Sequence, residues 1–175
     1  MEIKTKAVSL AFARDDFVSQ WGTIGSSWGI NRTMAQIHAL LIIAPHALST
    51  DDIMAELKIS RGNANTNLRE LAGWGLIRPV LRKGERKEYF EAEKDVWKMF
   101  CIIARERKRR EISPAMKVLA DCAERTKGLK DTEARAFHEQ MQSLLEFLRL
   151  GERVLEHIAA AEENKILKLA AKMLG

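Results

Sequence analysis

The chain has 175 residues and a mass of 19.9 kDa, enough for one domain with additional helices. Its 46% of hydrophobic residues can form a core, which excludes global disorder, and two cysteines are too few for a disulfide-stapled secreted scaffold. The longest apolar run, residues 39–45, is far shorter than the ~20 residues of a membrane span, and no signal peptide is expected. These features favour a cytoplasmic protein without a membrane partner.

The positive charge is concentrated in one short stretch. The chain carries +5 overall, with a pI of 9.3. Residues 58–87 contain eight basic and two acidic residues, net +6, which leaves −1 for the other 145 residues. Such a division is typical of a surface that faces phosphate groups, although an overall excess this small does not require a nucleic-acid partner.

The N-terminal region is expected to form two helices. The first spans about residues 4–28, with Val8, Phe12 and Val18 on one side. Asn31 is expected to cap a second helix, because the residues after it repeat apolar side chains at helical spacing.

Two further helices with clear starting residues follow. Ser49, with Asp52 three residues later, is a near-match to a capping box before a short helix. Ser60 is a third candidate cap, and Gly75 stands where a helix that ends in the left-handed conformation needs glycine. The helix from Ser60 has one apolar stripe, formed by Ala64, Leu68 and Leu71.

A β-hairpin is expected next. Residues 76–81 and 87–91 have the composition of short strands, and residues 82–86 form a turn that contains glycine. The order of helices followed by a hairpin is that of a winged helix-turn-helix, whose last helix before the hairpin enters the major groove.

The remainder of the chain is expected to be helical. A break is expected at Ser113-Pro114 and a turn at residues 127–128. An apolar stripe from Phe137 to Leu169 needs a surface to cover it, and a dimer partner would provide one. The predicted fold is mainly α with a small β-hairpin: an N-terminal helix that supports the core and takes part in the dimer (1–30), a winged helix-turn-helix (31–92) and a helical dimerisation region (93–175).

The helix that starts at Ser60 is the candidate reader of DNA. Opposite its apolar stripe it carries amide, hydroxyl and guanidinium groups, which can contact the edges of adenine, thymine and guanine. Taken alone, such a face is more typical of a solvent-exposed structural helix, but the capped helix before it and the basic hairpin after it favour DNA. The predicted contacts on this helix are Ser60, Arg61, Gly62, Asn63, Asn65, Thr66, Asn67 and Arg69.

The hairpin is the candidate wing. Arg82, Lys83, Arg86 and Lys87 surround Gly84 and are predicted to contact the DNA backbone or minor groove. The alternative is an ordinary charged turn that protects an edge strand.

The sequence also resembles a known family. The resemblance covers about residues 20–120 and rests on the stretches 28–33, 35–41, 60–63, 67–71, 74–76 and 84–87, with Tyr89, Trp97, 110–112 and Pro114. These residues resemble the GbsR-like branch of MarR transcriptional regulators. The resemblance implies a cytoplasmic homodimer that binds a pseudo-palindromic operator and usually represses. Some members of the branch respond to choline, but no complete ligand site matches here, so the existence and identity of an effector stay open.

No catalytic constellation is found, so the protein is not expected to be an enzyme. No cofactor or metal site is expected, because the histidines and cysteines lack ligand spacing. The aromatic residues are better explained by core packing than by a cage for a cation. Cys101 and Cys122 are expected to be reduced thiols, with a redox switch as the less favoured alternative.

The charged run 105–111 and the overall function each allow a second interpretation. The charged run 105–111 contains the pairs Glu106–Arg110 and Arg107–Glu111 at i,i+4 spacing, which favours a solvated helix face over a phosphate contact. The main functional alternative is a winged helix that binds protein and no DNA. The substitution Arg86→Glu separates the two readings, because only a DNA-binding protein should lose affinity and salt dependence together.

Overall fold

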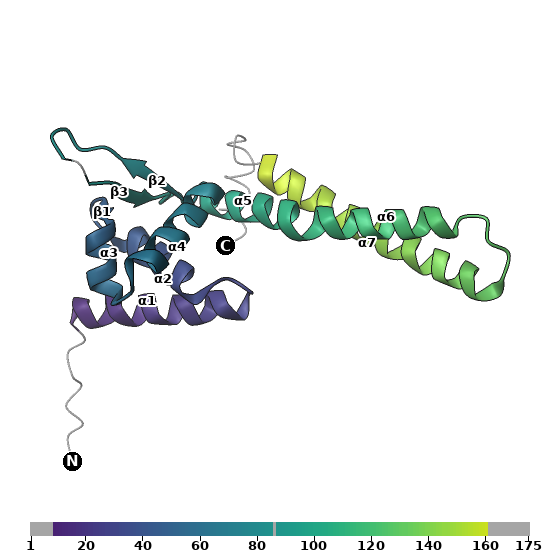
Figure 1. Cartoon of the computed structure of the whole chain (residues 1–175), viewed down its shortest axis with the longest axis horizontal. Helices are drawn as coiled ribbons and strands as arrows, with labels where there is room; N and C mark the ends of the chain where they lie inside the picture. Colours follow the sequence, from purple (N-terminus) through teal and green to yellow (C-terminus); the bar gives the residue numbers. More distant parts are fainter. Residues whose placement is uncertain (1–8, 86, 161–175) are drawn as a thin grey trace, which may run out of the picture. The chain divides into compact units, whose positions relative to one another are not determined.

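The computed structural model describes residues 9–85 and 87–160, the last three of them by their backbone alone. The chain divides into two compact units, Met1–Lys94 and Asp95–Gly175 (Figure 1). The predicted fold class is confirmed: the described residues are mainly helical, and a small antiparallel sheet accompanies the winged helix-turn-helix.

The described residues of the first unit form four helices, and the starts of the last three follow the predicted caps. They are α1 (Leu10–Ser27), α2 (Arg32–Ile43), α3 (Thr50–Leu57) and α4 (Arg61–Trp74). Each helix begins after a side chain that accepts a hydrogen bond from a backbone N–H of its first turn: Ser9, Asn31, Ser49 and Ser60.

The capping box before α3 is confirmed. Ser49 Oγ accepts from the N–H of Asp52 at 3.2 Å, and Asp52 Oδ2 accepts from the N–H of Ser49 at 2.9 Å. The end of α4 also follows the prediction, since Gly75 has φ +82°. The segment from α3 to α4 is therefore delimited at both of its ends by local features, the capping box before α3 and the glycine after α4.

The first helix differs from the prediction in one respect. Val18 is buried, but Phe12 is 63% exposed. Six residues separate the two, which places them about 120° apart around a helix, so they cannot share one narrow face. Val8, the third predicted member, lies outside the described residues.

Two glycines allow α1 to pack closely against α2. Gly22 and Gly25 are buried in α1. A Cβ at Gly22 would lie 2.6 Å from Cγ of Gln36, and a Cβ at Gly25 would lie 2.6 Å from Cβ of Ala35. The glycines thus permit a distance between the helices that other residues would prevent.

The sheet has three strands in the order β1-β3-β2, all antiparallel. The predicted hairpin is confirmed as β2 (Ile77–Val80) and β3 (Tyr89–Ala92), each shorter than expected. The strand β1 (Leu48–Ser49) was not predicted, because two residues are too few to show alternation. Pro79 fits the edge strand β2, where a missing N–H costs no central ladder bond.

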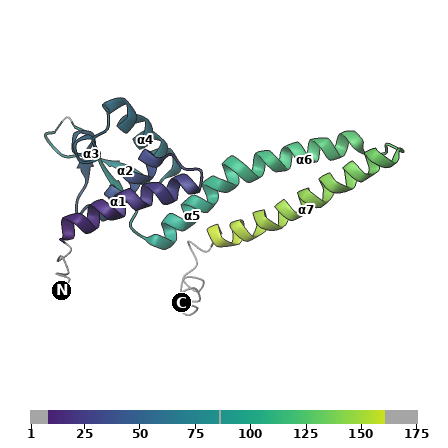
Figure 2. The same ribbon diagram turned by 90° about the horizontal axis from the view of Figure 1, so that it is seen from below.

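The second unit is a long hairpin of helices (Figure 2). One arm runs through α5 (Val96–Arg107), a π-helical turn η1 (Lys108–Ile112) and α6 (Ser113–Thr126). The other arm is α7 (Thr132–Ala160). The turn between them follows the prediction: Gly128 has φ +82°, and Asp131 caps α7 with Oδ1 2.7 Å from the N–H of Ala134.

The predicted break and restart at Ser113-Pro114 is confirmed only in part: α6 starts at Ser113 with Pro114 in its first turn, but no break in the helical backbone precedes it. Helical backbone continues through both residues, and the wider π turn precedes them. Proline lacks an N–H and its ring crowds the carbonyl four residues earlier. A local π turn relieves this crowding without ending the helix.

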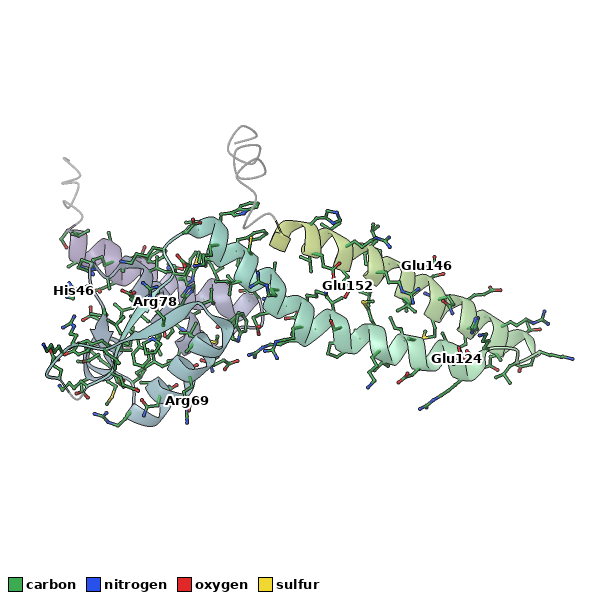
Figure 3. All side chains as sticks on the ribbon, turned by 90° about the horizontal axis from the view of Figure 1, so that it is seen from above. His46, Arg69, Arg78, Glu124, Glu146 and Glu152 are labelled. Atoms are coloured by element: carbon green, nitrogen blue, oxygen red, sulfur yellow. The ribbon has the colours of Figure 1, made fainter. Side chains whose placement is uncertain are left out.

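Buried apolar residues form the core of the second unit, and an ion pair also joins the two arms of the hairpin. Cys101, Ala104 and Leu145 are buried, whereas Phe100, predicted on the same face, is 46% exposed. Glu152, which is labelled in Figure 3, belongs to α7. Its carboxylate lies 3.2 Å from Nζ of Lys108. The predicted stripe residues beyond 160, including Leu169, lie outside the described part of the chain. None of the described helices combines the length and hydropathy that crossing a bilayer requires.

Candidate nucleic-acid interface

The helix α4 has one buried and one exposed side, as predicted. Ala64, Leu68 and Leu71 are at most 2% exposed and anchor the helix to the first unit. Arg69 lies on the outer side of the helix (Figure 3). The other predicted contact residues that are exposed are Ser60, Arg61, Gly62, Asn63, Asn65 and Thr66.

Asn67 corrects the predicted set. It is only 4% exposed, and its Nδ2 donates to the backbone oxygen of Asn63 at 2.9 Å and to the side-chain oxygen of Asn63 at 2.6 Å. Asn67 therefore faces the core and cannot reach a groove. Its position was readable from the sequence, because it stands three residues after Ala64 and one before Leu68, within the buried stripe.

The wing contains two kinds of basic residue. Lys83 and Lys87 are exposed, whereas Arg82 is half-buried. The Arg82 guanidinium lies 3.9 Å from the ring centroid of Tyr89 and donates to the carbonyl of Ala47 at 3.1 Å. Arg82 thus stabilises the base of the wing through contacts within the protein. The sequence analysis had predicted a contact with DNA for this residue and not this structural role. Arg86 lies outside the described residues.

Tyr89 is a second support of the wing. Its hydroxyl donates to a carboxylate oxygen of Glu85 across the hairpin turn. This hydrogen bond to Glu85 raises the pKa of Tyr89 above its usual value. The phenol therefore stays protonated and keeps donating at neutral pH.

An acidic residue joins the wing to the helix-turn-helix. Asp51, in the first turn of α3, accepts from Arg61 at 2.5 Å through Oδ1 and from Lys87 at 3.0 Å through Oδ2. The hydrogen bonds from Lys87 and Arg61 lower the pKa of Asp51, and the same contact with Asp51 raises the pKa of Lys87. The Asp51 carboxylate and the Lys87 ammonium group therefore remain charged at neutral pH.

Two hollows lie beside α4, and two residues, Asn65 and Glu88, line both. One, of about 360 Å³, separates α4 from strands β2 and β3. The other, of about 300 Å³, lies where α3, α4 and the start of β3 meet. The second hollow is lined by Ser49, Thr50, Asp51, Arg61, Asn65, Lys87 and Glu88.

Asp51 and Glu88 are the site residues that the sequence analysis missed. Both lie just outside the basic window 58–87, so counting charge within that window left them out. The fold nevertheless places both acidic residues beside the cations of that window, in the second hollow. The capping box at Ser49 indicated only that Asp51 lies in the first turn of α3, not that it meets Arg61 and Lys87.

The charged run in the second unit forms the predicted pairs. Arg107 lies 2.9 Å from Glu111, and Arg110 lies 3.1 Å from Glu106. Glu106 is only 9% exposed and also holds Arg109 at 2.7 Å. Hydrogen bonds from Arg109 and Arg110 lower the pKa of Glu106. This face is therefore an organised set of ion pairs that includes a buried carboxylate.

The remaining candidate residues are the two cysteines, the side chains that could bind a metal ion, and the aromatic rings. Cys101 is buried and Cys122 half-buried, both as free thiols. Among residues 9–85 and 87–160, no three histidine, cysteine or acidic side chains are placed to hold a metal ion. The aromatic rings form local pairs within single helices, Phe17 with Trp21 and Trp97 with Phe100, at 5.5 and 5.8 Å between centroids.

Comparison with known proteins supports the resemblance noted in the sequence. Residues 28–87, which span α2 to the wing, match the sequence model of the MarR family. The HTH-type transcriptional repressor GbsR of Bacillus subtilis (strain 168) is 20% identical over 98% of this chain and 100% of its own. The HTH-type transcriptional regulator MmpR5 of Mycobacterium tuberculosis (strain ATCC 25618 / H37Rv) is 26% identical over 76% of this chain and 78% of its own.

A solved structure shares the fold. It is the crystal structure of a transcriptional regulator, with a TM-score of 0.70, 20% identity, and coverage of 87% of this chain and 99% of that one. The shared fold is that of a transcriptional regulator of known structure. Residues 28–87 match the MarR family, and the chain along nearly its whole length is similar to the repressor GbsR.

Proposed function

We propose that the protein is a sequence-specific DNA-binding regulator of transcription, most simply a cytoplasmic repressor that acts as a homodimer. One observation carries the proposal: the exposed side of α4 presents amide, hydroxyl and guanidinium groups beside a basic wing of the same unit. The named relatives are a transcriptional repressor and a transcriptional regulator, which supports the same function and gives no support to an enzyme.

In this proposal α4 lies in the major groove. Asn65 and Thr66 contact adenine and thymine edges, and Arg69 makes a bidentate contact with guanine. The exposed Gly62 brings the first turn of α4 close to a phosphate, because an added Cβ has no neighbour within 4 Å in the protein and the space is open to DNA. Lys83, Arg86 and Lys87 contact the backbone from the wing.

The second unit supplies the proposed dimer interface. Leu145 of α7 is buried, whereas Phe147, two residues later, is 70% exposed. Two residues correspond to about 200° around a helix, so α7 has apolar residues on nearly opposite sides, and the residues that the structure describes bury Leu145 but leave Phe147 exposed. A second copy would cover the Phe147 side, and its two-fold symmetry requires half-sites ~10 bp apart or a multiple of that spacing.

The proposal is tested by replacing a predicted base-reading residue. Arg69→Ala should weaken binding to the DNA upstream of the protein's own gene by about 10-fold to 100-fold, and should relax the preference for guanine at one position per half-site. Fluorescence anisotropy with wild-type and base-substituted duplexes measures both effects.

A matched variant controls for the loss of one positive charge. Arg125→Ala removes an exposed arginine from the last turn of α6, in the second unit. It should change the affinity by less than about twofold. Equal effects of the two substitutions would contradict the placement of α4 in the groove and favour a winged helix that binds protein.

A further inference from the structure

A carboxylate lies among the cations of the proposed interface. Asp51 contacts Arg61 at the start of α4 and Lys87 at the end of the wing, at 2.5 and 3.0 Å. The Asp51 side chain is 43% exposed, and the two cations are 62% and 61% exposed. All three groups are thus open to a charged partner from solution.

The charges at this junction cancel. The hollow of about 300 Å³ around the three residues is lined by the cations Arg61 and Lys87 and by the acids Asp51 and Glu88. The stretch 58–87 that holds both cations has a net charge of +6. The part of the basic surface where the wing meets the helix-turn-helix is therefore neutral, although the sequence around it is strongly basic.

We propose that Asp51 is an internal competitor of DNA phosphate, and that it sets the sequence-independent part of the affinity for DNA. This inference rests on the proposed DNA-binding function. A phosphate that approaches Arg61 and Lys87 must displace the carboxylate or share the cations with it. Either event lowers the gain from each contact, because the carboxylate and the phosphate have the same charge.

The contact also explains why two cations from distant parts of the chain meet at one point. Arg61 and Lys87 are 26 positions apart, and without an anion between them they would repel each other. The carboxylate therefore holds the wing against the helix-turn-helix in the free protein. Contacts to phosphate carry no sequence information, so Asp51 should affect every duplex alike.

Asp51→Asn tests the inference, since it keeps the shape of the side chain and removes its charge. We expect affinity for an operator duplex and for a scrambled duplex to rise by the same factor, about fivefold at about 50 mM salt. The plot of log affinity against log salt should become steeper by up to about two phosphate equivalents, roughly 0.9 in slope for each. Fluorescence anisotropy at several salt concentrations gives both quantities.

Glu56→Gln is the matched control. It removes one negative charge from the same helix, α3, at an exposed residue that does not line the junction hollow. It should raise the affinity by less than about twofold. Asp51→Ser, which suits the first turn of a helix, is a second variant, and a thermal melt of each protein shows whether it is folded.

A double-mutant cycle with Lys87→Gln ties the effect to the contact. Loss of Lys87 should weaken DNA binding more in the Asp51→Asn background than in the wild type, because only there is the lysine unoccupied by the carboxylate. Equal losses in both backgrounds, or an Asp51→Asn effect no larger than that of Glu56→Gln, would overturn the inference while leaving the proposed function intact. Failure of the wild type to bind any duplex at low salt would contradict the proposed function, and this inference with it.

Discussion

At the scale of single residues, His38 gives the first unit a pH-dependent stability. It is 5% exposed in α2, and its Nε2 has no hydrogen-bond partner among the described residues. Burial lowers the pKa of His38 from 6.5 to about 4. Between these two values the unfolded chain binds a proton that the folded chain does not, so stability is lost as the pH falls through this range.

The expected loss is about 2 kcal/mol in the free energy of unfolding between pH 7 and pH 5. Urea denaturation at the two pH values measures it. His38→Leu, which has no titratable group at this position, should lose about 2 kcal/mol less over the same interval. An identical pH dependence in the two proteins would show that His38 is not held neutral by burial.

Residues differ in how far their sequence context reveals their place. The cap residues Asn31, Ser49 and Ser60 were predictable, because a cap and its helix are adjacent in sequence. Asp51 was not, since its partner Lys87 comes from an element 36 positions away. Asn67 shows the opposite error. Its spacing from Ala64 and Leu68 indicated a buried position, but its amide side chain led to the prediction of a DNA contact.

At the scale of elements, α4 offers a paired test with two glycines. Gly62 and Gly73 both lie in this helix, both are exposed, and an added Cβ at either position would meet no atom within 4 Å. Each substitution by alanine should stabilise the protein by about 0.5–1 kcal/mol, because glycine is a poor helix former. Thermal or urea denaturation measures this effect.

Only Gly62→Ala should weaken DNA binding, since only Gly62 lies in the first turn, where we propose a close approach to phosphate. We expect a loss of about fivefold or more in affinity, and no loss for Gly73→Ala, both from anisotropy titrations. If both variants bind as tightly as the wild type, the first turn of α4 does not approach the backbone as proposed.

The elements themselves were largely predictable where local chemistry decides their ends. The hairpin of β2 and β3 and the helices up to α4 follow their turn and cap residues. At Pro114 the expected start of an α-helix is present, but a π turn stands where a break was expected and keeps the backbone helical. The short strand β1 is defined by its pairing with β3, a contact between distant parts of the chain that no local sequence pattern indicates.

At the scale of the whole molecule, the proposed homodimer depends on the apolar side of α7 that the described part of the chain leaves exposed. Phe147, Leu150 and Val154 are between 51% and 70% exposed and recur at helical spacing. Phe147→Glu places a charge in this stripe. It should shift the protein from dimer to monomer at micromolar concentration, as measured by sedimentation equilibrium, because burying an unpaired carboxylate is costly.

Arg149→Glu provides the control for this substitution. It introduces the same residue two positions further along α7, about 200° around the helix, where the side chain is exposed. The dimer should persist in this variant. A monomer in both variants, or a dimer in both, would contradict an interface on the Phe147 side.

The central claim is specific binding of DNA, and one measurement tests it most directly. The wild-type protein is titrated onto the DNA upstream of its own gene and onto a scrambled duplex, at about 50 and about 200 mM salt, with fluorescence anisotropy as the readout. We expect tighter binding to the native duplex at both salt concentrations and a steep loss of affinity with salt on both duplexes. Equal, weak binding to the two duplexes would contradict specific recognition of this DNA and favour a winged helix that binds protein.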